Sequence, residues 1–399
     1  MERISADIMI SGGGIAGMTA ACAFGTAGFK VVCVDPAPPI THEADPKSDL
    51  RSTAFLQPAR NTLKTAGIWA HLEPYATPLD IMRLADAGGE LNEVRTVADF
   101  VASEISDEAF AWNLPNWLLR REMLKRIKEL NNVTFLTGAE TKRITPRTDR
   151  AYVQLSNQTQ VDCKLVLAAD GRNSPTRNML GIDAKTWRFG QKAIVFSVSH
   201  PRAHENVSTE IHRSGGPFTV VPLNDVDGQH FSAVVWMEKG AKAADLMAMD
   251  DAQFTETANA RSCGILGKLK LESRRMIWPI ISRLADKLYG PHTALIAEAA
   301  HVIPPIGAQG LNMSLTDIQC LLDLSIGNPQ QIGSPTMLAA YQKARYGDIK
   351  MRVKGVNLLN RAAMTDNENL KALRLKGLQT LHGFAPVRKS LMRKGLGSV

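Results

Sequence analysis

A glycine-rich loop between a short strand and a helix is the feature that most narrows the folds open to this chain. Residues 7–10, Asp-Ile-Met-Ile, predict a strand, and Gly12, Gly14 and Gly17 follow in G-x-G-x-x-G spacing before an alanine-rich helical segment. Glycines at this spacing let the backbone turn tightly and approach a pyrophosphate. The next strand ends at Asp35, an acid placed to accept ribose hydroxyl groups. The pattern predicts a βαβ unit that binds a dinucleotide, without separating FAD from NAD.

Two further apolar strands, far along the chain, run into acidic residues. Residues 165–169 lead to Asp170 and Gly171, and residues 294–297 lead to Glu298. Short continuous apolar runs are typical of strands buried on both faces. Together with the first strand, they predict one sheet that is interrupted by insertions.

The turn after Glu298 is the most informative segment for function. Its residues 304–310, Pro-Pro-Ile-Gly-Ala-Gln-Gly, open a helical pattern that runs from Leu311 to about Leu324. The start of a helix carries free backbone N–H groups and a partial positive charge. The segment therefore aims a positive helix end at a ligand.

The pattern changes between about residues 181 and 283. Alternating segments bounded by Gly, Pro, Asn and Asp occur there at residues 193–198, 218–221, 231–236 and 276–279. This alternation predicts a largely antiparallel sheet that forms a second domain. From about residue 335 to the end, the pattern is helical.

Length and composition set further limits. At 399 residues, the chain exceeds what one hydrophobic core usually supports, so two packed units are expected. No run of about 18 uncharged apolar residues occurs, and the first residues lack the layout of a secretory signal. We therefore expect a cytoplasmic protein, either free or peripheral at the inner face of the membrane. The five cysteines are odd in number and form no Cys-x-x-Cys pair, so we expect them to be reduced and buried, with no metal site.

The positive charge is concentrated at the end of the chain. The net charge is +8, and residues 343–399 alone contain 13 Lys and Arg against 3 Asp and Glu. No nucleic-acid-binding pattern accompanies these charges, so no nucleic acid partner is expected. An apolar helical stripe in this tail is formed by Leu370, Leu373, Leu378, Leu381 and Phe384. The tail favours contact with an anionic membrane surface or an acidic partner, and the alternative is that the stripe packs on the rest of the fold.

Three other polar residues carry weaker signals. Arg51 lies in a polar loop and Arg121 opens a helical segment, so each guanidinium could either bind phosphate or remain solvated. His301 follows the third strand, but a lone histidine there is more often a hydrogen-bonded structural residue than a base. No Ser/His/Asp set, paired-carboxylate motif or His-x-x-x-His site stands out, so no catalytic residue is assigned.

Taken together and in order, these elements resemble the FAD monooxygenases of the para-hydroxybenzoate hydroxylase type. Within that class, residues 51–55, 299–312 and 385–392 are similar to the ubiquinone-biosynthesis hydroxylase family. The resemblance covers essentially the full length, and the segment 299–312 is its most specific part. One departure is that much of the class has Gly-Asp where this chain has Ala297-Glu298, which leaves a carboxylate one methylene longer.

The resemblance implies an α/β fold with three parts: a Rossmann-like FAD-binding domain, an interleaved and mainly antiparallel β-sheet substrate domain, and a C-terminal helical segment. The implied FAD-binding domain comprises residues 1–70, 111–180 and 284–334. The implied substrate domain comprises residues 71–110 and 181–283, and the helical region comprises residues 335–399.

The resemblance also implies which residues bind the cofactor. The glycine loop and Asp35 would hold the ADP half of FAD, and the turn before the late helix would meet the pyrimidine edge of the flavin. Asp170 and Gly171 would serve the pyrophosphate and nicotinamide access, and Glu298 would lie by the ribityl group. The full set is Gly12, Gly14, Ile15, Ala16, Gly17, Asp35, Arg51, Arg121, Asp170, Gly171, Glu298, Pro305, Gly307, Gln309, Gly310, Leu311 and Asn312.

The implied activity is hydroxylation of the aromatic ring of a polyprenylated phenol in ubiquinone biosynthesis. FAD would be the bound cofactor, NAD(P)H a transient electron donor and O₂ the co-substrate. No second strand-linked G-x-G-x-x-G occurs, so NAD(P)H has no binding domain of its own. Two alternatives remain open: an FAD-dependent reductase of isoprenoid chains, and a weakly catalytic flavoprotein subunit of a quinone-biosynthesis complex. The basic C-terminal region would contact the membrane or such a complex.

Overall fold

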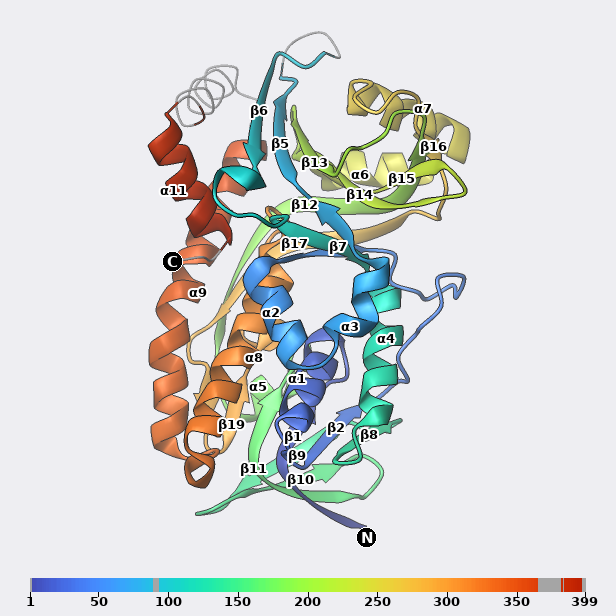
Figure 1. Cartoon of the computed structure of the whole chain (residues 1–399). Helices are drawn as coiled ribbons and strands as arrows, with labels where there is room; N and C mark the ends of the chain where they lie inside the picture. Colours follow the sequence, from blue (N-terminus) through green and yellow to red (C-terminus); the bar gives the residue numbers. More distant parts are fainter. Residues whose placement is uncertain (1, 89–92, 365–381, 383, 397–399) are drawn as a thin grey trace.

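The computed structural model describes residues 2–396 except for residues 89–92, 365–381 and 383. The described residues form two lobes, stacked one above the other in Figure 1. The lower lobe contains a mostly parallel sheet and the N-terminus, and the upper lobe contains a larger, mostly antiparallel sheet. A mixed fold of this kind confirms the predicted α/β class.

The sheet of the lower lobe is formed by β1 (Arg3–Ser11), β2 (Val31–Asp35), β8 (Val133–Thr137), β9 (Thr141–Pro146), β10 (Ala151–Leu155), β11 (Gln160–Ala168), β18 (Tyr289–Gly290) and β19 (Thr293–Leu295). Its order is β18-β19-β11-β1-β2-β8, and the pairs from β19 to β8 are parallel. Ile8, Met9 and Ile10 in β1 are fully buried, as expected for a strand that is covered on both faces. Because β11, β1 and β19 lie in one sheet although they are far apart in sequence, the predicted interrupted sheet is confirmed.

The last of these strands is shorter than predicted. β19 ends at Leu295, and a 3₁₀ turn, η3 (Ala297–Ala299), follows it. Ala297 has a φ of 54°, which an extended strand does not allow. Glu298 is therefore presented by a turn rather than by the end of the strand.

Helices cover this sheet and join the two lobes. The helical elements of the lower lobe are α1 (Ile15–Thr26), α2 (Gln57–Thr65), α3 (Trp69–Leu72), η1 (Glu73–Tyr75), α4 (Asn116–Glu129), α5 (Pro175–Met179), α8 (Gln309–Gly327) and η4 (Pro329–Gln331). The apolar side chains of α1, α2, α4 and α8 merge into one core with the parallel sheet. α8 confirms the predicted late helix and begins two residues earlier than expected.

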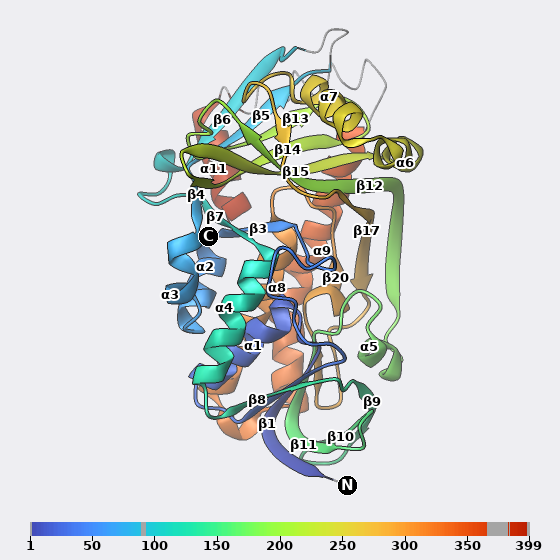
Figure 2. The same ribbon diagram turned by 90° about the vertical axis from the view of Figure 1, so that its right-hand side faces the viewer.

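The sheet of the upper lobe is formed by β5 (Ile81–Asp86), β6 (Thr96–Val101), β12 (Ala184–His200), β13 (Val207–His212), β14 (Pro217–Val226), β15 (Gln229–Lys239), β16 (Lys270–Leu271), β17 (Met276–Ala285) and β20 (His301–Val302). Its order is β20-β17-β12-β15-β14-β13-β5-β6. All of its pairs are antiparallel except β13 with β5, so the predicted antiparallel sheet between residues 181 and 283 is confirmed. β12 and β17 are long and extend down beside the lower lobe, as Figure 2 shows.

The two faces of this upper sheet have different surroundings. One face packs on α6 (Gly240–Ala248) and α7 (Asp251–Ser262) through an aromatic cluster of Phe196, Phe218, Trp236 and Phe254. Alternate residues of the same strands point to the opposite face, toward the lower lobe. A small sheet of β3 (Ser52–Leu56), β7 (Ala111–Pro115) and β4 (Thr77–Leu79), together with η2 (Ala102–Glu104), completes the connections.

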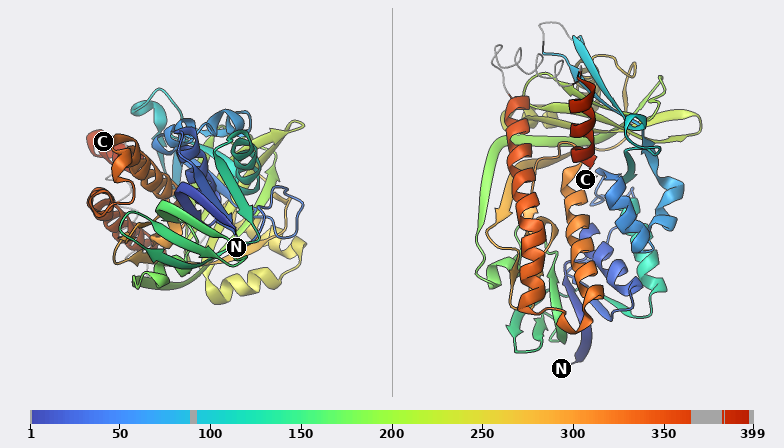
Figure 3. Two further views of the ribbon diagram at one scale, coloured as in Figure 1. Left: turned by 90° about the horizontal axis from the view of Figure 1, so that it is seen from below. Right: turned by 60° about the vertical axis from the view of Figure 1, so that its left-hand side comes forward.

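The described part of the C-terminal region is mainly helical, as predicted. α9 (Pro335–Met364) runs beside α8 and continues up to the upper sheet, as the right-hand view of Figure 3 shows. α11 (Ala385–Leu396) packs back on the upper lobe, where Arg388 binds Glu104 at 2.8 Å. Of the predicted apolar stripe, only Phe384 is described, with 59% of its surface exposed, and the four leucines lie outside the described residues.

The expectation that all five cysteines are reduced and buried is only partly correct. All five are free, and three are buried as expected, but Cys263 and Cys320 are partly exposed. Burial raises the pKa of Cys22 to about 12 and that of Cys320 to about 11, so neither forms a thiolate readily. Among the described residues, no helix has both the length and the apolar character needed to cross a bilayer.

Candidate functional site

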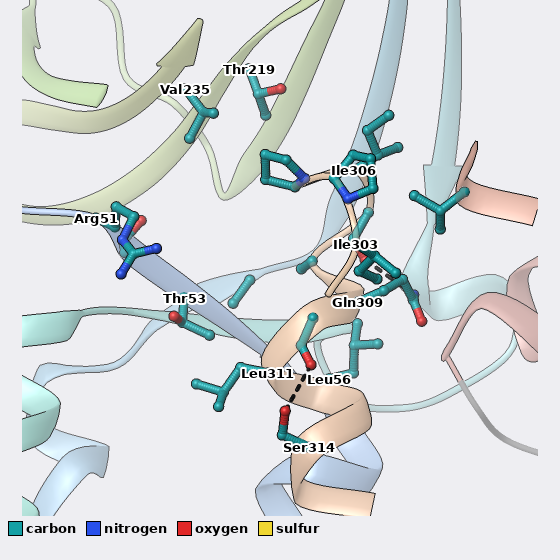
Figure 4. Close-up of a pocket in the computed structure, with 18 of the residues that line it drawn as sticks. Arg51, Thr53, Leu56, Thr219, Val235, Ile303, Ile306, Gln309, Leu311 and Ser314 are labelled. Carbon is teal, nitrogen blue, oxygen red and sulfur yellow. Dashed lines mark hydrogen bonds between the residues drawn. The ribbon is translucent and has the colours of Figure 1, made fainter. Parts of the chain in front are cut away.

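A cavity of about 1350 Å³ lies between the two lobes. The glycine loop, the start of β3 and the turn before α8 form its lower walls, and the open face of the upper sheet forms its upper wall. Figure 4 shows Thr219 and Val235 of the sheet above the turn that carries Ile303 and Ile306. Residues from all parts of the chain therefore meet at one site.

The three glycines of the loop have different reasons to be glycine. A Cβ on Gly12 would lie 2.4 Å from the Ala169 carbonyl oxygen, and one on Gly17 would lie 1.8 Å from the Gly12 carbonyl oxygen, so the packing of the chain itself requires both. A Cβ on Gly14 would meet no protein atom within 4 Å. Gly14 lines the cavity, whereas Gly12 and Gly17 do not. The open space at Gly14 is room for a ligand to approach the backbone.

Two helices begin at the cavity without a side-chain cap. Gly14 is the N-cap of α1 and Ala308 that of α8; neither position provides a capping side chain, and neither first turn contains an acid. Free N–H groups at a helix start favour an anion, and they are the usual seat of a pyrophosphate. The donors therefore fit an elongated ligand with a phosphate-bearing half at α1 and an acceptor-rich edge at α8, which is the chemistry of FAD.

Asp35 lies close to this loop but not on the cavity wall. Its Oδ2 accepts the backbone N–H of Gly13 at 2.7 Å, and its Oδ1 accepts that of Ala37 at 2.9 Å. The carboxylate thus fixes the loop on which the cavity depends. Its predicted contact with a ribose stays a prediction.

Arg51 stands on the cavity wall in a well-defined position. Its Nε and Nη2 bind the two oxygens of Asp49 at 2.8 and 2.7 Å, and its guanidinium lies 4.5 Å from the centre of the Trp278 ring. Burial alone would lower the pKa of Arg51, but the hydrogen bonds and charge of Asp49 more than offset it and raise the pKa. Arg51 therefore provides a fixed positive charge on the cavity wall.

The structure places Arg121 away from the cavity. Its Nε binds Glu122 at 2.6 Å, and its guanidinium packs over the rings of Tyr75 and Trp117. The preceding residue, Arg120, lines the cavity instead, with Nη2 3.7 Å from Asp49. Adjacent residues of a helix point about 100° apart. The sequence located the right helix but not which of the two arginines faces the site.

Asp170, Gly171 and Glu298 all line the cavity. The carboxylate of Asp170 accepts hydrogen bonds from the start of α5, namely from the Ser174 hydroxyl and the Thr176 backbone N–H. Glu298 is paired with Arg172, whose Nε lies 3.3 Å from Oε2. Sequence reasoning missed Arg172, although it lies directly after the Asp170-Gly171 pair. The Glu298 carboxylate, although one methylene longer than the aspartate found in much of the class, therefore still lines the cavity.

The turn before α8 presents most of its residues to the cavity, among them Pro305, Gly307, Gln309, Gly310 and Leu311. Asn312 instead points to β3, where it accepts the Leu56 N–H at 2.9 Å and donates to the Ala54 carbonyl at 2.8 Å. It does not line the cavity. Its role in this structure is to hold β3 against α8.

His301 belongs to a buried charged network. Its Nε2 lies 2.7 Å from Asp317, and Asp317 also accepts Arg345 Nε at 2.9 Å. Arg345 and Arg352 share Asp348, and Arg352 reaches Gln309 at the start of α8. The network joins α8 to α9. It gives His301 the hydrogen-bond partner that the sequence interpretation expected.

The upper wall was not identified from the sequence. Apolar residues of the sheet face the cavity there, together with the polar residues Asp86, Ser208, Glu210, His212 and Thr219. On β13 the cavity-lining residues Ser208, Glu210 and His212 stand at every second position, and this spacing is the signal that could have revealed them. α9 and α11 close this end with Gly355, Leu359 and Met392.

Comparison with known proteins agrees with this geometry. Residues 5–350 match the model of the FAD binding domain family. A ubiquinone hydroxylase, UbiL, of Rhodospirillum rubrum is 28% identical over 397 residues, which cover 99% of this chain and 90% of that protein. The 3-demethoxyubiquinol 3-hydroxylase of Escherichia coli is 25% identical over 406 residues, with full coverage of both. The human ubiquinone biosynthesis monooxygenase COQ6 is 25% identical and aligns over 97% of this chain and 91% of its own length.

Solved structures share the fold. The p-nitrophenol 4-monooxygenase PnpA of Pseudomonas putida superposes with a TM-score of 0.79 at 17% identity and 99% coverage of both chains. PqsL of Pseudomonas aeruginosa, in complex with 2-aminobenzoylacetate, superposes with a TM-score of 0.75 at 20% identity, covering 91% of this chain and 97% of that one. The resemblance to ubiquinone-biosynthesis hydroxylases is therefore confirmed, and FAD is the cofactor. Because the family model spans most of the sequence, the chain belongs to the FAD binding domain family.

Proposed function

We propose that this protein is an FAD-dependent monooxygenase that hydroxylates the aromatic ring of a polyprenylated phenol in ubiquinone biosynthesis. The observation that carries the proposal is the single cavity, which joins uncapped helix starts at one end to an apolar sheet face at the other. The named relatives include ubiquinone hydroxylases from bacteria and a ubiquinone biosynthesis monooxygenase from humans.

When bound, FAD supplies the redox chemistry, passing electrons from NAD(P)H to O₂ so that one oxygen atom can be added to the ring. The chain supplies binding, orientation and exclusion of water. The start of α8 favours negative charge at its end of the cavity. The apolar upper wall keeps water from the reacting atoms.

The cavity geometry supports most of the proposed cofactor contacts. Gly14, Ile15 and Ala16 would meet the pyrophosphate, with Arg51 and Arg120 near the ring system. Asp170, Gly171 and Glu298 line the same cavity. The turn that contains Pro305, Gly307, Gln309, Gly310 and Leu311 would meet the flavin edge. Gly12, Gly17, Asp35 and Asn312 would act indirectly by shaping the walls.

Metabolite profiling of a deletion strain tests this function. Loss of the gene should stop quinone synthesis at a phenol that lacks one hydroxyl group, and purified enzyme should add one atom of ¹⁸O₂ to that phenol with NAD(P)H. If the deletion strain instead accumulated a quinone whose ring is fully hydroxylated but whose prenyl chain is incompletely saturated, the isoprenoid reductase would be supported. Rescue of the strain by a variant that cannot bind FAD would support the assembly subunit.

We further propose that the surface formed by α9 and α11 contacts an anionic membrane. Met351, Leu358 and Leu359 on α9 and Phe384 before α11 are each at least 59% exposed, and Lys354 and Arg361 lie on the same helix as the first three. Exposed apolar residues flanked by basic ones are typical of peripheral membrane contact. The same surface borders the α9 and α11 end of the cavity, where a prenyl tail would leave the bilayer.

Co-sedimentation with vesicles containing anionic lipid tests this contact. Leu358→Asp should reduce the bound fraction, and so should removal of residues 365–399, while FAD stays bound. Val226→Asp changes an exposed residue at the end of β14 and should leave binding unchanged. Unchanged sedimentation of both altered proteins would exclude the membrane contact, and a protein partner would then have to be sought.

A further inference from the structure

One carboxylate on the upper wall has no place in the proposed cofactor site. Glu210 lies on β13, lines the cavity and is only 5% exposed. Among the described residues, its only side-chain partner is His212, whose Nε2 lies 3.4 Å from Oε2 of Glu210. A buried carboxylate normally accepts several hydrogen bonds, because its desolvation is costly. One distant partner leaves most of that capacity for a ligand.

The strand register places Glu210 in the middle of the upper wall. Glu210 pairs with Thr219 on β14 and with Leu84 on β5, and Thr219 pairs with Val235 on β15. Paired residues on one face have Cβ atoms about 5 Å apart. Figure 4 shows Thr219 and Val235 above the turn that leads into α8, so Glu210 stands on the same wall, one strand from Thr219 and two strands from Val235.

The surroundings of Glu210 contain both apolar and polar residues, with Thr219 opposite it on β14 and Ser208 two residues before it on β13. Met82, Leu84 and Val221 line the same cavity. His212 lies two residues further along β13, and Asp86 stands opposite it on β5, with Arg95 Nε bound to Asp86 at 2.8 Å. Of the two carboxylates on this wall, Asp86 is bound by Arg95, whereas Glu210 has, among the described residues, only His212 beside it. A mainly apolar wall with such a carboxylate suits a substrate that is apolar apart from a hydroxyl group.

We propose that Glu210 is a catalytic base that binds and deprotonates the ring hydroxyl of the substrate, with His212 as its positioning residue. This assignment rests on the proposed function. The phenolic O–H bond breaks, its electron pair stays on oxygen and its proton moves to the Glu210 carboxylate. A C–O bond then forms on the electron-rich ring as the O–O bond of O₂ breaks, and the ring carbon loses its hydrogen as a proton when the ring regains aromaticity. NAD(P)H provides the two electrons as a hydride, and with one further proton from solvent the second oxygen atom leaves as water. The proton returns to the phenolate before the product leaves.

Glu210→Gln tests the assignment, because the amide keeps the shape and an acceptor oxygen but cannot take the proton. Its hydroxylation rate at pH 7 should fall by about 10²- to 10⁴-fold. The rate of Glu210→Gln should rise again toward about pH 10, where a free phenol ionises without a base. Glu210→Asp should keep part of the activity, and His212→Gln should change the pH profile more than the substrate affinity.

Binding of a probe gives a second readout. A nitrophenol with one isoprene unit should bind wild-type holoenzyme with a larger phenolate absorbance at neutral pH than it shows when bound to Glu210→Gln. Glu205→Gln, an exposed change just before β13, is the matched control and should leave rate and spectrum unchanged. FAD content and thermal midpoint show that each variant is folded.

The outcomes separate the two proposals. If wild-type enzyme hydroxylates no phenol, the proposed function fails. If wild-type enzyme hydroxylates the phenol and folded Glu210→Gln matches it in rate, pH profile and probe spectrum, only the role of Glu210 is overturned. If Glu210→Gln does not fold, the other two variants decide. The role of Glu210 would be overturned if Glu210→Asp had the same rate and probe spectrum as wild type and His212→Gln had no effect.

Discussion

At the residue scale, the cavity depends on a few side chains that fix its walls. Asp49 is an example, because it binds Arg51 through both oxygens and also accepts Asn116 Nδ2 at 3.0 Å. Burial alone would raise the pKa of Asp49, but the hydrogen bonds with Arg51 and Asn116 and the charge of Arg51 lower it below the ordinary value.

This lowered pKa predicts a loss of stability in acid. An aspartate whose pKa is lower in the folded state contributes stability that is complete above its unfolded value, about 3.9, and is lost as the pH falls through the folded value. Asp49→Asn should therefore be less stable than wild type at pH 7 and should lose less further stability on acidification. Urea unfolding at several pH values between about 3 and 6 measures the difference. Asp107→Asn, an exposed change, should keep the wild-type dependence.

Asn312 predicts a second effect at this scale. Its amide satisfies the buried N–H of Leu56 and the carbonyl of Ala54, so Asn312→Ala leaves both without that partner. The free energy of unfolding should fall by about 1–3 kcal/mol. Loosening of β3, which follows Arg51, should also speed the release of FAD, measured as the appearance of free flavin fluorescence. Asn61→Ala, on the exposed side of α2, is the control and should change neither quantity. If Asn312→Ala released FAD at the wild-type rate, Asn312 would not be needed to hold β3 at the cofactor site.

At the scale of elements, the glycine loop separates folding from binding. Gly14 has an ordinary φ of −69° and open space around a Cβ, so Gly14→Ala should fold with wild-type stability but bind FAD more weakly, measured by fluorescence titration. In Gly17→Ala, the new methyl group would overlap the Gly12 carbonyl, and the overpacking should cost about 1–3 kcal/mol of stability. Equal FAD affinity in Gly14→Ala and wild type would show that the ligand does not approach this position.

The same scale shows what the sequence could predict. The glycine loop and the turn before α8 combine local patterns with fixed geometry, and the structure places them as expected. The buried strands lie in one sheet as predicted, although β19 ends two residues early. The upper wall depends on strand register, which brings Leu84 on β5 beside Glu210 on β13 across more than a hundred residues. Nothing in the local pattern encodes that pairing. For the same reason, the choice between Arg120 and Arg121 and the inward turn of Asn312 toward β3 required the packed structure.

At the scale of the whole molecule, α9 links the cofactor end of the cavity to its apolar end. Arg352 reaches Gln309 at the start of α8, and Gly355, less than one turn later, lines the cavity. A glycine inside a helix is destabilising by about 1 kcal/mol relative to alanine, so its presence calls for a reason. A Cβ on Gly355 would meet nothing within 4 Å, so the cavity wall is open at this position, where the prenyl tail of the proposed substrate would pass.

Gly355→Leu should therefore separate stability from substrate choice. The helix should gain up to about 1 kcal/mol of stability from the better helix former, while the new side chain fills the passage. The ratio of kcat/KM for a long-tailed phenol to that for a phenol with one isoprene unit should fall by about 10-fold or more. Gly347→Leu is the matched control, because that glycine is on the same helix with open space around it but does not line the cavity. If both variants kept the wild-type ratio, the prenyl tail would have to leave the cavity by a route that does not pass α9.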